Sequence, residues 1–224
     1  HVKELTNDSN TQVVCGFNQT LFDTHEVRMV TIERTLERLG ISYTMSDNLS
    51  HQLRGNGDRH ILGLLIYMFD GADSPLFEQA GNAYAQREQD LETLIRSEDD
   101  LTRYLLPGVD KFVRHMRKAE KQAQIQSHSS DAFIEQFLQR VIVDGRPISD
   151  TFIHTNILDR KKDLSYNILI IGDNKSDANS VLQRNNAAGL LVNDNDIARA
   201  KLLASYGREQ NIVIAKSLGE VFYG

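Results

Sequence analysis

The sequence contains a single cysteine, Cys15, among its 224 residues. It can form no intramolecular disulfide, which excludes the small secreted domains that depend on such bonds. No apolar run approaches the length of a membrane span, and residues 1–12 lack the apolar stretch of a signal peptide. We therefore expect a cytoplasmic protein with no membrane partner. Because the chain begins with His1 instead of Met, a removed targeting segment stays open.

Positive charge is also scarce, since 25 Lys and Arg residues stand against 31 Asp and Glu residues and give a net charge of -6. This balance offers no broad attraction to nucleic acid, so we expect no nucleic-acid partner. The histidines show no HxxxH or HExxH spacing, which disfavours a zinc site. The absence of GxGxxG and GxxxxGK loops disfavours dinucleotide and P-loop binding.

In the first half of the chain, one short predicted strand is followed only by predicted helices. Residues 11–17 read as a buried strand, and residues 1–10 are polar and are expected to be a disordered tail. Helical spacing then predicts helices over 25–40, 61–69 and 74–105, with a polar loop and one short helix between residues 41 and 58. In the last helix, Phe77, Tyr84, Leu91 and Leu105 recur at multiples of seven and indicate one apolar stripe.

Beyond Pro107 the sequence alternates between strand and helix patterns. The predicted strands are 123–127, 141–143, 167–172, 188–192 and 211–214, and the predicted helices between them are 109–120, 131–140, 176–185 and 195–206. Such alternation predicts an α/β fold whose parallel sheet is covered on both faces. The expected domains are an α/β core formed by residues 11–23 and 106–224, and an all-helical insertion formed by residues 24–105.

Two apolar runs stop abruptly at polar loops, VVCGFNQTLFDT at 13–24 and ILIIGDNKSD at 168–177. The carboxyl ends of parallel strands are where open α/β sheets place their ligand sites. The two loops together resemble the first and last motifs of haloacid dehalogenase-like phosphohydrolases. The first motif in that family is a strand followed by Asp-x-Asp-x-Thr. Anchored on Thr20, its two aspartates fall on Gly16 and Asn18, and its usual glycine falls on Gln19.

The other motifs follow in the order of that family. A strand ending at Ser127 matches the second motif, which binds the transferring phosphoryl group. Lys161 and Lys162 are candidates for the single lysine of the third motif, although its neighbouring proline is missing. Gly172, Asp173 and Asp177 match the Gly-Asp-x-x-x-Asp of the fourth motif.

The resemblance also implies an architecture. A helical insertion at residues 24–105 corresponds to the cap of the phosphoglycolate phosphatase and β-phosphoglucomutase branch, and the Gly-Asp-Arg-His run at 57–60 is similar to that branch. The resemblance therefore implies a three-layer core with a parallel sheet and an inserted all-α cap.

In active members, as the resemblance implies, the first aspartate attacks phosphorus and the second moves a proton. Mg²⁺ is held there by the first carboxylate, a backbone carbonyl and a fourth-motif aspartate. In this chain Gly16 provides no nucleophile, and Asn18 cannot ionise to shuttle a proton. Asp173, Asp177 and the carbonyl of Asn18 remain as ligands for a weakened Mg²⁺ site.

Other residues offer partial substitutes. Cys15 is a nucleophile by chemistry, but alternation along a strand points it away from the face of Gly16, which favours a core residue. His128, beside Ser127, is either an acid–base group or a loop histidine. Asp173, Asp177 and Ser127 also have structural interpretations, as residues that shape turns and helix starts.

These residues leave three functional hypotheses. The leading one is a catalytically dead or impaired phosphatase relative that binds a small phosphorylated metabolite or anion through Ser127 and a lysine, and acts in binding or regulation. The second is an active Mg²⁺-dependent phosphatase in which Asp173, Asp177 or His128 activates water. The third is a module that binds a protein partner.

Overall fold

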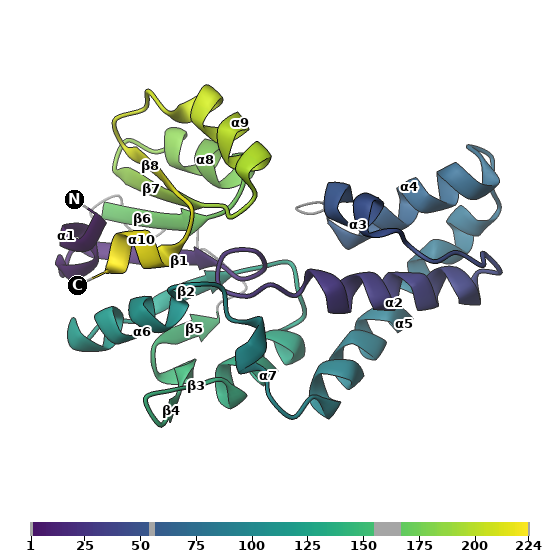
Figure 1. The fold of residues 1–224 in the computed structure, drawn as a ribbon, viewed down its shortest axis with the longest axis horizontal. Coiled ribbons are helices and arrows are strands. Elements are labelled where there is room, and N and C mark those ends of the chain that lie inside the picture. The colour runs from purple at the N-terminus through teal and green to yellow at the C-terminus, as the bar shows by residue number, and fades with distance from the viewer. Residues whose placement is uncertain (1, 54–56, 155–166, 224) are drawn as a thin grey trace. The chain divides into compact units, whose positions relative to one another are not determined.

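The computed structural model describes residues 2–53, 57–154 and 167–223, and these residues form two compact units (Figure 1). The core unit contains residues 1–23 and 100–224, and the helical unit contains residues 24–99. The second boundary thus lies before the predicted one at residue 105. Leu105 belongs to the core unit because it forms a β-bridge with Phe22, while the carbonyl of Tyr104 accepts a hydrogen bond of 2.8 Å from the amide of Asp23.

The core unit is built on a six-stranded sheet whose order is β5-β2-β1-β6-β7-β8. Its strands are β1 (Thr11–Gly16), β2 (Ala123–Gln126), β5 (Phe152–His154), β6 (Asn167–Gly172), β7 (Ala187–Val192) and β8 (Ile212–Ala215). All neighbouring pairs are parallel, which confirms the predicted sheet. From β1 the chain steps outward to β2 and β5, and from β6 it steps the opposite way, so the direction reverses between β1 and β6.

One predicted strand does not join this sheet. Residues 141–143 were expected to do so, but β3 (Ile142–Val143) pairs antiparallel with β4 (Arg146–Pro147) in a separate two-stranded sheet. The edge position belongs instead to β5, which lies in a stretch without a strong strand pattern. The turn Asp144-Gly145 takes positive φ at both residues, which is the geometry of a tight hairpin.

Helices follow the strands in regular order. The core unit contains α1 (Val2–Asn7), α6 (Val109–Lys118), α7 (Asp131–Arg140), α8 (Lys175–Leu182), α9 (Asp196–Tyr206) and α10 (Leu218–Phe222), with short 3₁₀ turns η1 (Thr102–Tyr104) and η2 (Ile148–Asp150). Because connections between parallel strands are right-handed as a rule, this strand order puts α6 and α7 on one face of the sheet and α8 and α9 on the other. The two faces covered by helices make the expected three layers (Figure 1).

An aromatic cluster holds the loop after β1 against α7. Phe17 and Phe22 lie on that loop with ring centroids 4.8 Å apart, and each also packs on Phe137 of α7, at 5.4 Å and 4.7 Å. All three rings are fully buried. Burial of side chains this large stabilises the local fold by about 1.5–3 kcal/mol each, so the path of this loop is set by packing.

The first residues correct the prediction of a disordered tail at residues 1–10. They form α1, with Val2 and Thr6 buried one helical turn apart. Thr6 shares a 2.7 Å hydrogen bond with the imidazole of His115, and Lys3 donates a 2.7 Å hydrogen bond to the carbonyl of Tyr223. These partners lie more than a hundred residues away in the sequence, so local polarity does not reveal the helix.

The helical unit consists of α2 (His25–Arg38), α3 (Asp47–Leu53), α4 (Asp58–Asp70) and α5 (Leu76–Ser97). Helix α5 is shorter than the predicted helix 74–105, and its buried residues are Arg87, Leu91 and Ile95, while Phe77 is 40% exposed. The apolar residues of α2, α3 and α4 form one buried cluster that includes Ile32, Leu36, Ile61, Leu65 and Ile66. None of the helices in the described ranges is long and apolar enough to cross a membrane.

A buried ionic cluster ties three helices of this unit together. Asp58, at the start of α4, is 7% exposed and pairs with Arg28 of α2 and Arg87 of α5. The Nε of Arg28 lies 3.1 Å from Asp58 Oδ2, and Arg87 also pairs with Glu88. Arg87 is only 1% exposed, so its charge depends on these carboxylates.

The substitution Asp58→Asn tests this cluster. It leaves two buried guanidinium groups without their shared counter-charge, so we expect the free energy of unfolding to fall by about 3–5 kcal/mol. Urea denaturation followed by far-UV circular dichroism measures the change. The control is Asp73→Asn, at an exposed carboxyl of the same unit, which should leave the midpoint unchanged. Equal midpoints for the two variants would show that the cluster contributes nothing.

Candidate functional site

The polar loops after β1, β2 and β6 meet at one edge of the sheet. In the strand register, Gly16 of β1 lies beside Gln126 of β2, and Cys15 lies beside Ile171 of β6. This edge is the carboxyl end of all three strands, and it is also where the direction of the strand order reverses. Open α/β sheets bind their ligands at this point, so the structure brings the predicted motifs to the expected place.

The loop after β1 is a tight turn. The carbonyl of Phe17 accepts hydrogen bonds from the amides of Leu21 and Phe22, at 3.0 and 3.1 Å, and Gln19 has a φ of 61°. A residue with a side chain is strained in this left-handed region, and it is the position where the resemblance implies a glycine. The Gln19 amide side chain donates a 2.9 Å hydrogen bond to Asp23, which stabilises the turn.

Gly16 ends β1 with no room for a side chain in this arrangement. A Cβ atom on Gly16 would lie 2.7 Å from Thr20 Oγ1, which is closer than real Cβ contacts. Thr20 is 1% exposed, and its hydroxyl donates a 3.3 Å hydrogen bond to Asp173 Oδ1 at the end of β6. The space beside the strand end is thus taken by a hydroxyl group that is bonded to the fourth-motif carboxylate.

Asp173 is a buried acid in a hydrogen-bonded setting. It is 8% exposed, and Asn174 donates a second hydrogen bond of 3.2 Å to its Oδ1. The side chain of Asn193 binds its backbone carbonyl at 3.0 Å. Burial raises the pKa of Asp173 to about 7, and the negative charge of Asp177 acts in the same direction.

One carboxylate oxygen of Asp177 is bonded to the backbone at the start of α8. Its Oδ2 accepts hydrogen bonds from the backbone amides of Asp173 and Asn174, at 3.0 and 3.3 Å. Asn174 in turn accepts from the amides of Ser176 and Asp177, so the two residues form a capping box at the start of α8. Gly172 permits this fold-back, because a Cβ there would lie 2.2 Å from the Asp177 carboxyl group. Burial also raises the pKa of Asp177.

The loop after β2 approaches the loop after β1 through hydroxyl and amide groups. Asn18 donates a 3.0 Å hydrogen bond from Nδ2 to Ser129 Oγ, and the amide of Ser129 donates to Ser127 Oγ at 3.1 Å. Ser130, and not Ser127, is the N-cap of α7. His128 is exposed in this loop. Lys161 and Lys162, the predicted phosphate-binding lysines, lie outside the described residues.

These donors do not fit a tightly held Mg²⁺. The ion prefers an octahedron of hard oxygens that includes carboxylates, and Gly16 supplies none. Within residues 2–53, 57–154 and 167–223, no group of three His, Cys, Asp or Glu side chains converges to hold a metal. One oxygen of each aspartate is already engaged, since Thr20 and Asn174 bind Asp173 Oδ1 and two backbone amides bind Asp177 Oδ2.

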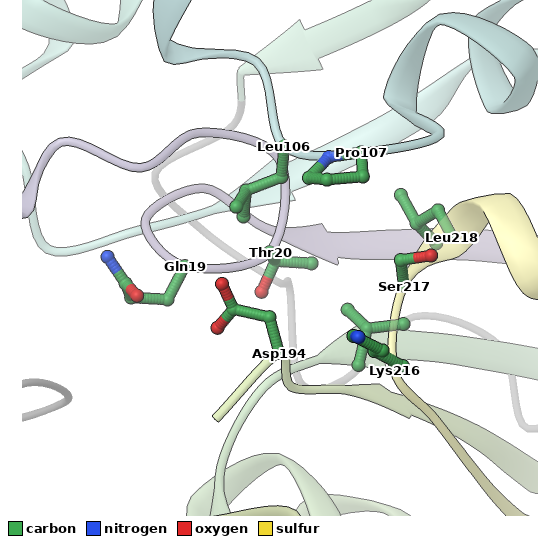
Figure 2. A pocket seen from close by; sticks show the side chains of 9 residues that line it. Gln19, Thr20, Leu106, Pro107, Asp194, Lys216, Ser217 and Leu218 are labelled. Carbon is green, nitrogen blue, oxygen red and sulfur yellow. The ribbon is translucent and has the colours of Figure 1, made fainter. Parts of the chain in front are cut away.

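A small pocket of about 20 Å³ lies beside this site in the core unit (Figure 2). Thr20 and Gln19 line it on one side, and residues of the loops after β7 and β8 line it on the other. The residues around it are Gln19, Thr20, Leu106, Pro107, Val192, Asp194, Lys216, Ser217 and Leu218. Such a volume accommodates one water molecule or the end group of a larger ligand.

Sequence reasoning missed several residues of this site. Thr20 served only to align the first motif, and its bond to Asp173 requires two strands that are far apart in the sequence. Ser129 and Asn193 carry no motif. Asn174 did carry a signal, because Asn followed three residues later by Asp just before an apolar helix is a capping pattern.

No protein-family model matches the chain, and no curated protein matches it by sequence. A HAD hydrolase of family IA, variant 3, from Entamoeba histolytica is similar in structure, with a TM-score of 0.65 at 16% identity over 94% of each chain.

Two further solved structures are similar. β-Phosphoglucomutase from Clostridium difficile has a TM-score of 0.63 at 14% identity, covering 94% of this chain and 92% of that chain. CbbY from Rhodobacter sphaeroides, in complex with xylulose-(1,5)bisphosphate, has a TM-score of 0.58 at 14% identity, covering 92% and 85%. The chain therefore has the haloacid dehalogenase-like fold of hydrolases and phosphatases, which confirms the resemblance seen in its motifs. Identities this low establish the fold alone.

Replacing Asp173 with Asn should stabilise the metal-free protein at alkaline pH. The folded-state pKa of about 7 lies above the usual 3.8, so ionisation destabilises the folded state as the pH rises through this window. An asparagine cannot ionise and still accepts the hydrogen bonds of Thr20 and Asn174. In EDTA at pH 8 we expect a gain of up to about 4 kcal/mol, which declines toward pH 4.

Thermal unfolding of both proteins across this pH range measures the effect. Asp194→Asn, at an exposed carboxyl of the same unit, is the control and should show no comparable gain. A gain from Asp173→Asn that is the same at pH 4 and pH 8 would contradict a buried carboxylate.

Cys15 should not react with thiol reagents in the folded protein. It is fully buried in β1, and burial strongly raises the pKa of its thiol, so little reactive thiolate forms. Because it is the only cysteine, labelling by a chromogenic disulfide reagent reports on this residue alone. We expect labelling only after addition of denaturant. Rapid stoichiometric labelling of the native protein would place Cys15 at an accessible site.

Proposed function

We propose that this chain is a phosphatase-fold protein that binds a small phosphorylated molecule or anion without transferring its phosphoryl group, in a binding or regulatory role. The observation that carries this proposal is the end of β1, where Gly16 supplies no nucleophile and Thr20 Oγ1 occupies the place of a side chain. We also propose that the helical unit serves as a cap and that the protein works in the cytoplasm, which suits a chain with one cysteine.

The remaining polar groups support weak chemistry at most. Asn18 cannot ionise, and its amide already donates to Ser129. Loss of a general acid–base group alone costs about 10²–10⁴-fold in rate, and the covalent route is lost as well. The misfit of the donor set to Mg²⁺ removes a further source of charge stabilisation. All of these losses slow phosphoryl transfer, and none of them disturbs the fold.

Ligand capture is better supported than turnover. Without a carboxylate at position 16, the strand end repels an anion less, and Asp173 is the acidic group that remains beside it. The hydroxyl groups of Ser127 and Ser129 and the amides of their loop are donors suited to phosphate oxygens. The structurally similar CbbY holds a bisphosphorylated sugar, which supports a phosphorylated metabolite as the ligand class.

A second candidate function, a protein-binding module, is favoured by one observation. Helix α4 exposes three consecutive large side chains, Tyr67, Met68 and Phe69, which are 56%, 53% and 44% exposed. Consecutive residues point in different directions around a helix, so these three side chains offer apolar contacts around its last turns. Loss of a partner on Met68→Glu, with phosphate binding retained, would favour this second function.

The purified protein with Mg²⁺ should release no phosphate from p-nitrophenyl phosphate or from a panel of phosphorylated metabolites. The variant Gly16→Asp, Asn18→Asp, Gln19→Gly restores the family pattern and should gain measurable hydrolysis. Its third change also relieves the positive φ at position 19. The gain requires Thr20 to rotate away from position 16, which a side chain can do.

The matched control carries Gly16→Asn with the same two other changes, because asparagine has the shape of aspartate without its nucleophilic charge. It should remain inactive. Magnesium-dependent hydrolysis by the unmodified chain that disappears in Asp173→Ala would overturn the proposal and favour direct attack by water at an active phosphatase.

A further inference from the structure

The pocket beside Thr20 brings together two charged groups of opposite sign. Lys216 enters from the loop after β8, and Asp194 enters from the loop after β7 (Figure 2). Gln19 and Ser217 add an amide and a hydroxyl group to its rim. The remaining apolar wall is formed by Leu106, Pro107, Val192 and Leu218. All these residues belong to the core unit.

Neither charge has a partner among the residues that the structure describes. The ammonium group of Lys216 and the carboxylate of Asp194 make no ion pair or hydrogen bond there, and they do not pair with each other. A neighbouring acidic residue does have a partner, since Asp196 forms an ion pair with Arg199. Two unpaired charges of opposite sign at one pocket are complementary to a ligand that carries both signs itself.

We propose that this pocket binds an aminoalkyl phosphate, with the phosphate on Lys216 and the ammonium group on Asp194. The pocket has room for one end group, so the ligand must be short and lie across the opening. Lysine is a suitable point charge for phosphate, and Ser217 can donate a further hydrogen bond to it. This inference rests on the proposed function for the class of ligand, a small phosphorylated molecule. It places the phosphate in the pocket beside Thr20, which neither Ser127 nor Ser129 lines.

The charges also predict which ligands bind less well. A bisphosphate brings a second negative charge toward Asp194, so it should bind more weakly than the aminoalkyl monophosphate. A phosphate ester without an ammonium group leaves Asp194 without a partner. Exposed ion pairs contribute little, so this difference should amount to about fivefold in Kd.

The experiment is an NMR titration with two probes of equal size, O-phosphoethanolamine and propyl phosphate, in which a methyl group replaces the ammonium group. In the unmodified protein we expect O-phosphoethanolamine to bind about fivefold more tightly. Asp194→Asn should abolish the difference between the probes. Lys216→Gln should weaken both, and Lys201→Gln, at an exposed lysine of α9, should weaken neither.

Inorganic phosphate serves as the third probe and separates this inference from the proposed function. If it shifts the amides of Ser127 and Ser129 while the two esters bind equally well in all variants, the pocket assignment is overturned and phosphate binding by the site stands. If no phosphate compound binds, both proposals fail.

Glycerophosphoethanolamine distinguishes the two sources of such a ligand. If it binds more tightly than the monoester, the ligand is a lipid headgroup. If it binds more weakly, the ligand is a free metabolite, and either result supports the pocket.

Discussion

The hydrogen bond between the Thr20 hydroxyl and Asp173 joins the two loops on which the site depends. It connects the end of β1 to the end of β6, where the strand order changes direction. In this arrangement the threonine occupies the space that a side chain at position 16 would need. Gly16 therefore differs from a nucleophile position in its surroundings as well as in its own residue type, because a hydrogen-bonded hydroxyl group lies beside it.

The motif residues that remain divide into two groups by their contacts. Asp177 and Asn174 start α8 through a reciprocal capping box, which is a structural role that persists without catalysis. Asn18 and the serine loop after β2 keep polar groups at the strand ends, where an anion can be bound. The turn at α8 and the polar site at the strand ends thus depend on different hydrogen bonds.

The prediction from sequence was most accurate where the pattern is local and strong. The runs of β-branched residues around Val13 and Ile170 mark central strands, since a strand buried on both faces is apolar along its whole length. The sequence pattern was weaker at the N-terminus and at the edge strand of the sheet. Helix α1 and strand β5 were missed because their stability comes from partners distant in sequence, and the helix of residues 74–105 ends earlier because Tyr104 and Leu105 pair with the core unit.

By itself the sequence determined which chemical groups exist at the site: a glycine, an asparagine and two aspartates at fixed spacing, which already exclude the usual nucleophile. Only the tertiary structure decided how those groups are used. The bond from Thr20 to Asp173 joins segments that are 153 residues apart. The backbone path after β6 turns one Asp177 oxygen toward the amides of Asp173 and Asn174. Spacing along a chain fixes the identity of neighbours within a motif, but packing in three dimensions fixes which of their atoms remain available.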